Sequence, residues 1–133
     1  MTINGGCLCG KVQYQISGPL HDASHCHCSM CRRQHGAALA TYAGFSTDDF
    51  SWTAGEELVK NYAPPDGMGW CFCSECGSTL GGTDAGKIVS ITLGTVSGDP
   101  GIRPESHIFV GSKAPWYEIH DSLPQFDEWG PES

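Results

Sequence analysis

The chain has few basic residues and lacks any long apolar run. Only 7 of its 133 residues are Lys or Arg, against 15 Asp or Glu, which gives a formal net charge of −8 at pH 7. Binding to nucleic acid or to an anionic membrane surface requires clustered basic side chains, so we expect neither partner. The longest apolar stretch, Ala37 to Phe45, is far too short to span a membrane and is interrupted by Thr41 and Gly44.

The first residues also lack the features of a secretory signal. Met1 to Gly6 has neither a basic region nor an apolar one. We therefore expect a cytoplasmic protein, in a compartment where thiols stay reduced. The length suits one domain, and no stretch resembles a linker, so we expect a single zinc-binding domain over residues 1–133.

Long helices are not expected, because 18 Gly and 8 Pro would interrupt them. The fold class predicted is mainly β, with few short helices. Residues 11–16 alternate polar and apolar side chains, which is the pattern of a half-buried strand. Further strands are expected at residues 37–45, 57–62, 70–72, 87–93 and 107–110. One short helix is expected at residues 29–35, with Ser29 as its N-cap.

Cysteine, in contrast, is abundant, and the eight cysteines form three tight groups. The groups are Cys7 and Cys9, then Cys26, Cys28 and Cys31, then Cys71, Cys73 and Cys76. Cysteines one or two residues apart can direct both thiolates at one tetrahedral ion, whereas a disulfide between such close neighbours is strained. The spacing therefore favours zinc over disulfides.

Two of the groups suggest the halves of one closed site. Cys73 and Cys76 are followed by Gly77, which can adopt the left-handed conformation of a tight metal-binding turn. The sequence Cys7-Leu8-Cys9-Gly10 ends in the same way. Four thiolates from these segments would form a structural zinc site that ties the first strand to the middle of the chain.

The remaining trio, Cys26, Cys28 and Cys31, has one ligand too few for a closed site of four thiolates. Three protein ligands with a vacant fourth position are typical of a catalytic zinc. A fourth ligand from the chain would instead make the site structural, and spacing leaves this choice open. The candidates for that ligand are His25, His27, His35 and Cys71.

Five motifs occur in a fixed order, spread along almost the whole chain. They are Gly6-Cys7-Leu8-Cys9-Gly10, the segment from Cys26 to Arg32 with Gly36-Ala37 behind it, the segment from Phe72 to Leu80, the segment from His107 to Trp116, and the segment from Asp121 to Phe126. In this order they resemble the glutathione-dependent formaldehyde-activating enzyme family, the S-(hydroxymethyl)glutathione synthase-like and centromere protein V-like zinc proteins.

The resemblance implies a zinc-stapled fold of small antiparallel sheets, called a β-tent. It also implies two zinc ions per chain, a structural one on Cys7, Cys9, Cys73 and Cys76 and a catalytic one on Cys26, Cys28 and Cys31. The family reaction is the condensation of formaldehyde with glutathione, formally a carbon–sulfur lyase step in reverse. An open zinc position suits that reaction, because it can bind a small thiol and hold it as the nucleophilic thiolate.

Other side chains are candidates for the rest of the chemistry. His27 and His107 could act as a general acid near neutral pH. The carboxylates of glutathione could be held by Arg32, Arg33 or Lys113.

The chain departs from the family pattern next to the third cysteine group. Trp70 stands where family members usually carry an Arg, and Cys71 is an additional cysteine. We expect Trp70 to belong to the strand core. We expect Cys71 to be a buried, inert thiol, with the alternative that it is a fourth zinc ligand.

A different class of function stays open beside the enzyme. Both zinc ions could be structural, and the protein could act through a surface that binds a partner. The aromatic candidates for such a surface are Trp116, Tyr117, Phe126 and Trp129. Thiol redox chemistry is less favoured, because the chain lacks a lone C-x-x-C within a βαβ pattern.

Overall fold

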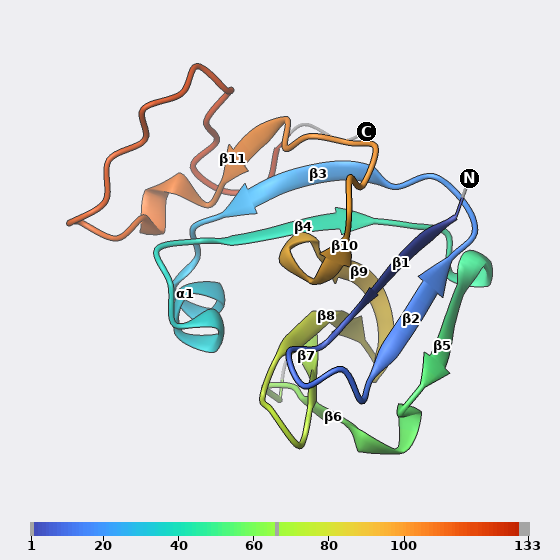
Figure 1. Cartoon of the computed structure of the whole chain (residues 1–133). Helices are drawn as coiled ribbons and strands as arrows, with labels where there is room; N and C mark the ends of the chain where they lie inside the picture. The colour runs from blue at the N-terminus through green and yellow to red at the C-terminus, as the bar shows by residue number, and fades with distance from the viewer. Residues whose placement is uncertain (1, 66, 131–133) are drawn as a thin grey trace.

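The computed structural model describes residues 2–65 and 67–130, and most of its regular structure is β (Figure 1). The strands are β1 (Ile3–Gly6), β2 (Gln13–Ile16), β3 (His21–Cys26), β4 (Ala40–Gly44), β5 (Phe50–Ala54), β6 (Val59–Tyr62), β7 (Gly69–Cys73), β8 (Thr79–Asp84), β9 (Lys87–Thr92), β10 (Val96–Ser97) and β11 (Ser106–Ile108). The helices are α1 (Ser29–His35) and the 3-10 turns η1 (Thr47–Asp49), η2 (Glu56–Leu58), η3 (Leu93–Thr95) and η4 (Val110–Ser112). Within these residues no helix is long and apolar enough to cross a membrane.

The strands form two sheets. One has the order β10-β1-β2-β5 and the other the order β11-β3-β4-β9-β8-β7-β6. Every pairing is antiparallel except that of β11 with β3. The predicted fold class, mainly β with antiparallel sheets and few short helices, is confirmed.

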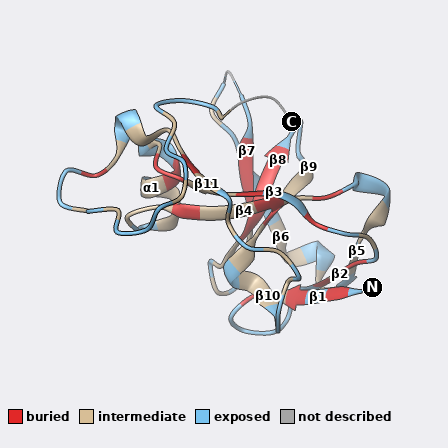
Figure 2. Cartoon of the chain, turned by 90° about the horizontal axis from the view of Figure 1, so that it is seen from above, coloured by how far each residue is buried: buried red, intermediate tan, exposed pale blue. Residues whose placement is uncertain are grey.

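The main core lies between the two sheets. Tyr14 and Ile16 from β2 are buried against Ala43 from β4 and Ile91 from β9. This burial confirms the period-two pattern of the strand predicted at residues 11–16. Figure 2 shows that buried residues are concentrated on the central strands, where the sheets meet.

The other predicted strands all exist, but with shifted ends. β4 starts three residues late, because α1 ends at His35 with a left-handed C-cap at Gly36 (φ 62°) and the chain bends at residues 37 and 38 before the strand. β6 starts at Val59 because η2 occupies the preceding residues. β11 stops at Ile108, since Phe109 adopts a positive φ of 55°. These changes of backbone conformation set where a strand begins or ends. The alternation of apolar and polar residues does not reveal them.

Five strands were not predicted, namely β1, β3, β5, β8 and β10. Strand β8 shows why. It contains Gly81 and Gly82, and glycine has a low propensity for β-strands. A side chain at Gly81 would collide with the backbone oxygen of Ser90 on β9. Glycine is therefore present here for the close approach of two strands, which local sequence does not reveal.

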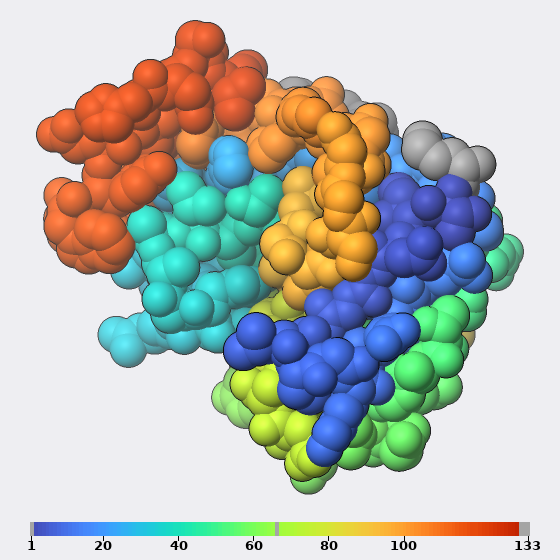
Figure 3. All heavy atoms as spheres, viewed as in Figure 1, coloured from blue at the N-terminus to red at the C-terminus, as the bar shows by residue number. Residues whose placement is uncertain are grey.

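The chain path places the candidate ligand cysteines in two separate groups. The β1–β2 loop lies beside the β7–β8 loop, and the end of β3 leads directly into α1 (Figure 1). Because β11 pairs with β3, with Ile108 opposite Cys26, the C-terminal residues are placed next to this region. In Figure 3 the orange-red residues that follow β11 lie beside the cyan residues of α1 and β4.

Candidate functional site

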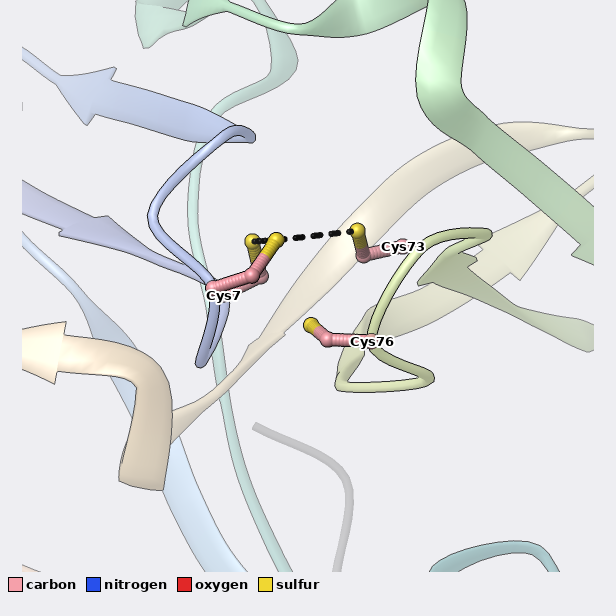
Figure 4. Close-up of side chains that lie close together, drawn as sticks. Cys7, Cys73 and Cys76 are labelled. Carbon is pink, nitrogen blue, oxygen red and sulfur yellow. Dashed lines mark hydrogen bonds between the residues drawn. The ribbon is translucent and has the colours of Figure 1, made fainter.

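Four cysteine sulfurs converge between two loops. Cys7 and Cys9 come from the β1–β2 loop, Cys73 ends β7, and Cys76 lies in the turn before β8. All four Sγ atoms lie within 4.8 Å of one another. Figure 4 shows Cys73 and Cys76 pointing across the gap toward Cys7. We call this group the first sulfur cluster.

The distances in the first sulfur cluster suit a metal better than a disulfide. The Sγ atoms of Cys7 and Cys9 are 3.5 Å apart, and those of Cys9 and Cys73 are 3.9 Å apart. A disulfide needs about 2.05 Å. Four sulfurs at about 2.3 Å from a tetrahedral zinc would be ~3.8 Å from one another. The donor set therefore fits zinc in both chemistry and size.

Two turns that each contain a left-handed glycine shape this cluster. Gly10 and Gly77 both have a φ of 80°, a left-handed conformation that L-residues rarely adopt. The N–H of Gly10 donates to the carbonyl of Cys7, and that of Gly77 donates to the carbonyl of Cys73. The left-handed conformation expected for Gly77 is confirmed. Each turn folds the chain so that two nearby thiols face the same point.

Ser78 connects the two halves of the first sulfur cluster. The N–H of Leu8 donates to Ser78 Oγ at 2.9 Å, and Ser78 Oγ lies 3.3 Å from Cys76 Sγ. Since the serine oxygen accepts from Leu8, its own hydrogen is available for the sulfur. This hydrogen bond lowers the pKa of Cys76 to about 5, so the cluster already favours one thiolate at neutral pH.

The trio forms a second sulfur cluster at the start of α1. Cys26 ends β3, Cys28 precedes the helix, and Cys31 lies in its first turn. Their Sγ atoms also lie within 4.8 Å of one another. The expected N-cap Ser29 is wrong: the cap is Cys28, whose Sγ accepts the N–H of Cys31 at 3.2 Å. One thiol thus serves both as helix cap and as candidate ligand.

In residues 2–65 and 67–130, no fourth Cys, His, Asp or Glu ligand atom joins the trio. The four candidates for that position are engaged elsewhere. His25 Nδ1 pairs with Thr41 Oγ1, and His35 Nδ1 pairs with the carbonyl of Cys31. His27 pairs with His107. Cys71 is buried in an apolar cluster with residues such as Leu80.

The thiols of the trio affect one another strongly. Hydrogen bonds from the thiols of Cys26 and Cys31 lower the pKa of Cys28. Hydrogen bonding to Cys28 and Cys31, together with burial, raises the pKa of Cys26. Three thiolates this close repel one another, so full ionisation requires a bound cation. Zinc or a similar soft cation is the partner that such a donor set selects.

Two aromatic side chains adjoin the trio and were not predicted as site residues. Trp70 Nε1 donates to the hydroxyl oxygen of Tyr42 at 2.8 Å, and the Tyr42 hydroxyl donates to Cys31 Sγ at 3.6 Å. Trp70 is buried, as expected for strand core, but it packs in one cluster with Cys26 and Cys31. No local pattern marks Tyr42, since β9 and β8 separate its strand from that of Trp70 and only the folded sheet brings the two side chains into contact.

A hydrogen-bonded chain of side chains lies beside the trio. His27 Nε2 is 2.8 Å from His107 Nδ1, and His107 Nε2 is 3.0 Å from Asp121 Oδ2. Both imidazoles are fully buried, and burial lowers the pKa of His27 to about 4. The sequence motifs contained both His107 and Asp121, but only the pairing of β11 with β3 brings them to His27.

The expected anion-binding residues differ in their surroundings. Lys113 Nζ donates to the backbone carbonyls of Ala114 and Tyr117. Arg32 has a buried Nε without a hydrogen-bond partner, while Arg33 is exposed. The ammonium group of Lys113 is therefore engaged with the backbone. Arg32 and Arg33 are the basic residues near the trio to which the fold gives no such task.

Two comparisons with known proteins point to one family, and a third finds a solved structure that is similar. The family described as glutathione-dependent formaldehyde-activating enzyme matches residues 2–112. A Halomonas elongata protein, provisionally named a glutathione-dependent formaldehyde-activating enzyme, is 28% identical over 128 residues, which cover 90% of this chain and 82% of that protein. A crystal structure of a Rhodobacter sphaeroides protein is similar with a TM-score of 0.55 and 26% identity, covering 72% of this chain and 89% of the other.

Proposed function

Because this chain belongs to the glutathione-dependent formaldehyde-activating enzyme family, we propose that it is a zinc-dependent carbon–sulfur lyase-type enzyme. Its substrate would be a small thiol, glutathione or a similar molecule, which adds to formaldehyde or is released in the reverse reaction. Cys26, Cys28 and Cys31 would hold the catalytic zinc. Cys7, Cys9, Cys73 and Cys76 would hold the structural zinc.

One observation carries this proposal. The trio converges on one point, while no fourth ligand from the described chain reaches it. A closed structural site needs four protein ligands, whereas a catalytic site keeps one position for substrate. When bound there, zinc supplies a Lewis acid that lowers the pKa of a thiol and so makes it nucleophilic at neutral pH.

The chain's own groups have defined tasks around that position. The backbone N–H of Cys31 donates to Cys28 Sγ, and the Tyr42 hydroxyl donates to Cys31 Sγ. Both hydrogen bonds stabilise negative charge on sulfur and orient the two side chains. Arg32, beside the trio in α1, is the candidate to hold a carboxylate of the thiol substrate.

Proton transfer is not assigned to either expected histidine. The ionised Asp121 only accepts, so His107 donates to it from Nε2, while His107 Nδ1 is paired with His27 Nε2. Both ring nitrogens of His107 and Nε2 of His27 are therefore engaged within the chain of three side chains. The general-acid role expected for His27 or His107 gains no support from this arrangement.

The alternative is a noncatalytic domain with two structural zinc ions. Trp116 and Trp129 favour it, because 70% and 68% of their surface is exposed. Large exposed aromatic side chains are typical of surfaces that bind a partner. For either function we propose a cytoplasmic location and a single domain. We also propose that the protein has no nucleic-acid or membrane partner, because its net charge of −8 disfavours binding to anionic surfaces.

The decisive experiment measures metal content by mass spectrometry in the parent protein and in Cys28→Ala. Formation of S-(hydroxymethyl)glutathione is followed above the uncatalysed background in both. We expect two zinc ions to fall to about one, with activity lost and the fold kept. Cys71→Ala, which removes a cysteine outside both clusters, is the matched control and should keep both ions.

Other results would count against the proposal. Two zinc ions in the parent with no activity toward glutathione or other small thiols would favour the noncatalytic domain. Two ions retained in Cys28→Ala would show that the trio is not a separate metal site.

A further inference from the structure

We propose that Tyr42 is a positioning residue of the trio's metal centre, and that Trp70 fixes the direction of its hydroxyl group. The inference rests on the proposed function, because it assigns a task toward the metal that the trio would hold. It concerns two side chains outside the set of cysteine ligands.

The contacts come from three separate elements. Cys31 lies on α1, Tyr42 on β4 and Trp70 on β7. The Tyr42 oxygen is 3.6 Å from Cys31 Sγ and 2.8 Å from Trp70 Nε1. Trp70 is only 7% exposed, as is Cys31, so water has little access to this pair of hydrogen bonds.

The direction of the two hydrogen bonds follows from the chemistry of the groups. An indole N–H can only donate, so the Tyr42 oxygen must be the acceptor in its contact with Trp70. A phenol has a single hydrogen, and Cys31 Sγ is the acceptor within reach. Trp70 thus leaves the Tyr42 hydroxyl one favourable orientation, toward the sulfur.

The tyrosine ring is held in place from the helix side. The ring of His35 packs edge-on against that of Tyr42, with centroids 5.4 Å apart. His35 Nδ1 is in turn 3.0 Å from the backbone oxygen of Cys31. Cys31 therefore contacts Tyr42 through its sulfur and also holds His35, which packs against the Tyr42 ring. These contacts fix the position of the ring relative to the sulfur.

A hydrogen bond of this kind has two consequences for a ligating thiolate. It holds the sulfur in the position that coordination requires, and it withdraws part of its negative charge. The first effect increases metal affinity. The second leaves a bound cation more electrophilic. Outer-shell groups of this type typically contribute about 10- to 100-fold in affinity or activity.

The test is Tyr42→Phe, which removes the hydroxyl and keeps the ring. Zinc transfer to a chromogenic chelator is followed in time, and the phase that belongs to the trio is identified by its absence in Cys28→Ala. We expect this phase to be about 10- to 100-fold faster in Tyr42→Phe, with the other phase unchanged. In the cobalt-substituted protein, the thiolate-to-cobalt absorption band should shift. Trp70→Phe should change both readouts in the same direction, but less.

Tyr14→Phe is the matched control. Tyr14 is also a buried tyrosine, and its hydroxyl pairs with Thr95 Oγ1 at 2.8 Å, away from any sulfur. It should lower stability but leave the trio's release phase and the cobalt band unchanged.

Three results would overturn the inference. An unchanged release phase and cobalt band in Tyr42→Phe would refute the role of Tyr42 while leaving the proposed function intact. If Tyr42→Phe accelerated both zinc-release phases equally, and Tyr14→Phe did the same, the effect would be a general loss of stability. A parent protein that binds only one metal would refute the proposed function and this inference together.

Discussion

Cys71 differs from the other seven cysteines in its surroundings. It is not a member of either sulfur cluster, is 3% exposed, and packs in one buried cluster with Val12, Leu80 and the first-cluster residues Cys7 and Cys73. Burial raises its pKa to about 11, so the group stays a neutral thiol at physiological pH. A neutral thiol is a poor nucleophile and a poor metal ligand. The environment therefore supports the expectation of an inert, apolar cysteine.

Substitution of Cys71 should affect stability and not metal content. Cys71→Ser places a hydroxyl in an apolar site and should cost about 1–3 kcal/mol in the free energy of unfolding, measured with denaturant. Its zinc content by mass spectrometry should equal that of the parent. Loss of one zinc ion in Cys71→Ser would identify this residue as the fourth ligand and contradict the open site.

At the scale of elements, the segment after β11 folds back onto β11, which itself pairs with β3. His107 pairs through its backbone with Pro124 and Phe126, and through its side chain with Asp121. The hydrogen bond from His107 lowers the pKa of Asp121 below its ordinary value. The ionised carboxylate thus helps to hold the C-terminal segment on the sheet that carries the trio.

This attachment should depend on pH in a defined direction. A carboxyl group with a lowered pKa in the folded state stabilises the fold above its unfolded pKa of about 3.9. The stabilisation is lost as the pH falls through the lower folded pKa. Asp121→Ala should therefore be less stable than the parent at pH 7, and the difference should begin to shrink near pH 4 and vanish only below the lowered folded pKa of Asp121. Thermal unfolding across this range measures it.

A control in the same segment separates this effect from a general one. Asp127→Ala removes another carboxylate of the segment and should change stability little at either pH. At pH 7, hydrogen exchange of residues 107–126 should be faster in Asp121→Ala alone. Equal exchange in both variants would show that the Asp121 hydrogen bond does not hold the segment.

At the scale of the whole molecule, the two sulfur clusters should contribute differently to the stability of the fold. The first cluster joins sites 64 residues apart, since it links Cys9 with Cys73. The trio lies within one continuous turn of chain from β3 into α1. A crosslink that closes a long loop removes more entropy from the unfolded chain than one that closes a short loop. The first cluster should therefore dominate the stability of the fold.

Cys73→Ala should consequently lower the midpoint of thermal unfolding more than Cys28→Ala. Loss of a structural zinc is expected to cost roughly 3 kcal/mol or more, which corresponds to about 10 °C in a domain of this size. Cys28→Ala should lower the midpoint by only a few degrees, about 1 kcal/mol. A strong chelator should reproduce the larger effect in the parent. Equal midpoints for the two variants would contradict the assignment of the first cluster as the structural site.

The predictions that agree with the structure rest on short-range patterns. Each pair of thiols and the trio spans only a few residues, and Gly10 and Gly77 supply the turns, so convergence within each pair and within the trio is a local property. The alternation over Gln13–Ile16 likewise follows from one buried face. Family membership, too, could be stated from the motifs, because their order along the chain is itself sequence information.

What depended on packing between distant strands was not visible in the sequence. The glycines of β8, the cap by Cys28, and the contact of Trp70 and Tyr42 with Cys31 all arise where separate elements meet. By itself, the sequence determined the local groups of candidate ligands, the class of fold and the family, since these depend on patterns along the chain. Only the tertiary structure decided which side chains surround the trio, because hydrogen bonds between α1, β4 and β7 exist only once the strands have paired.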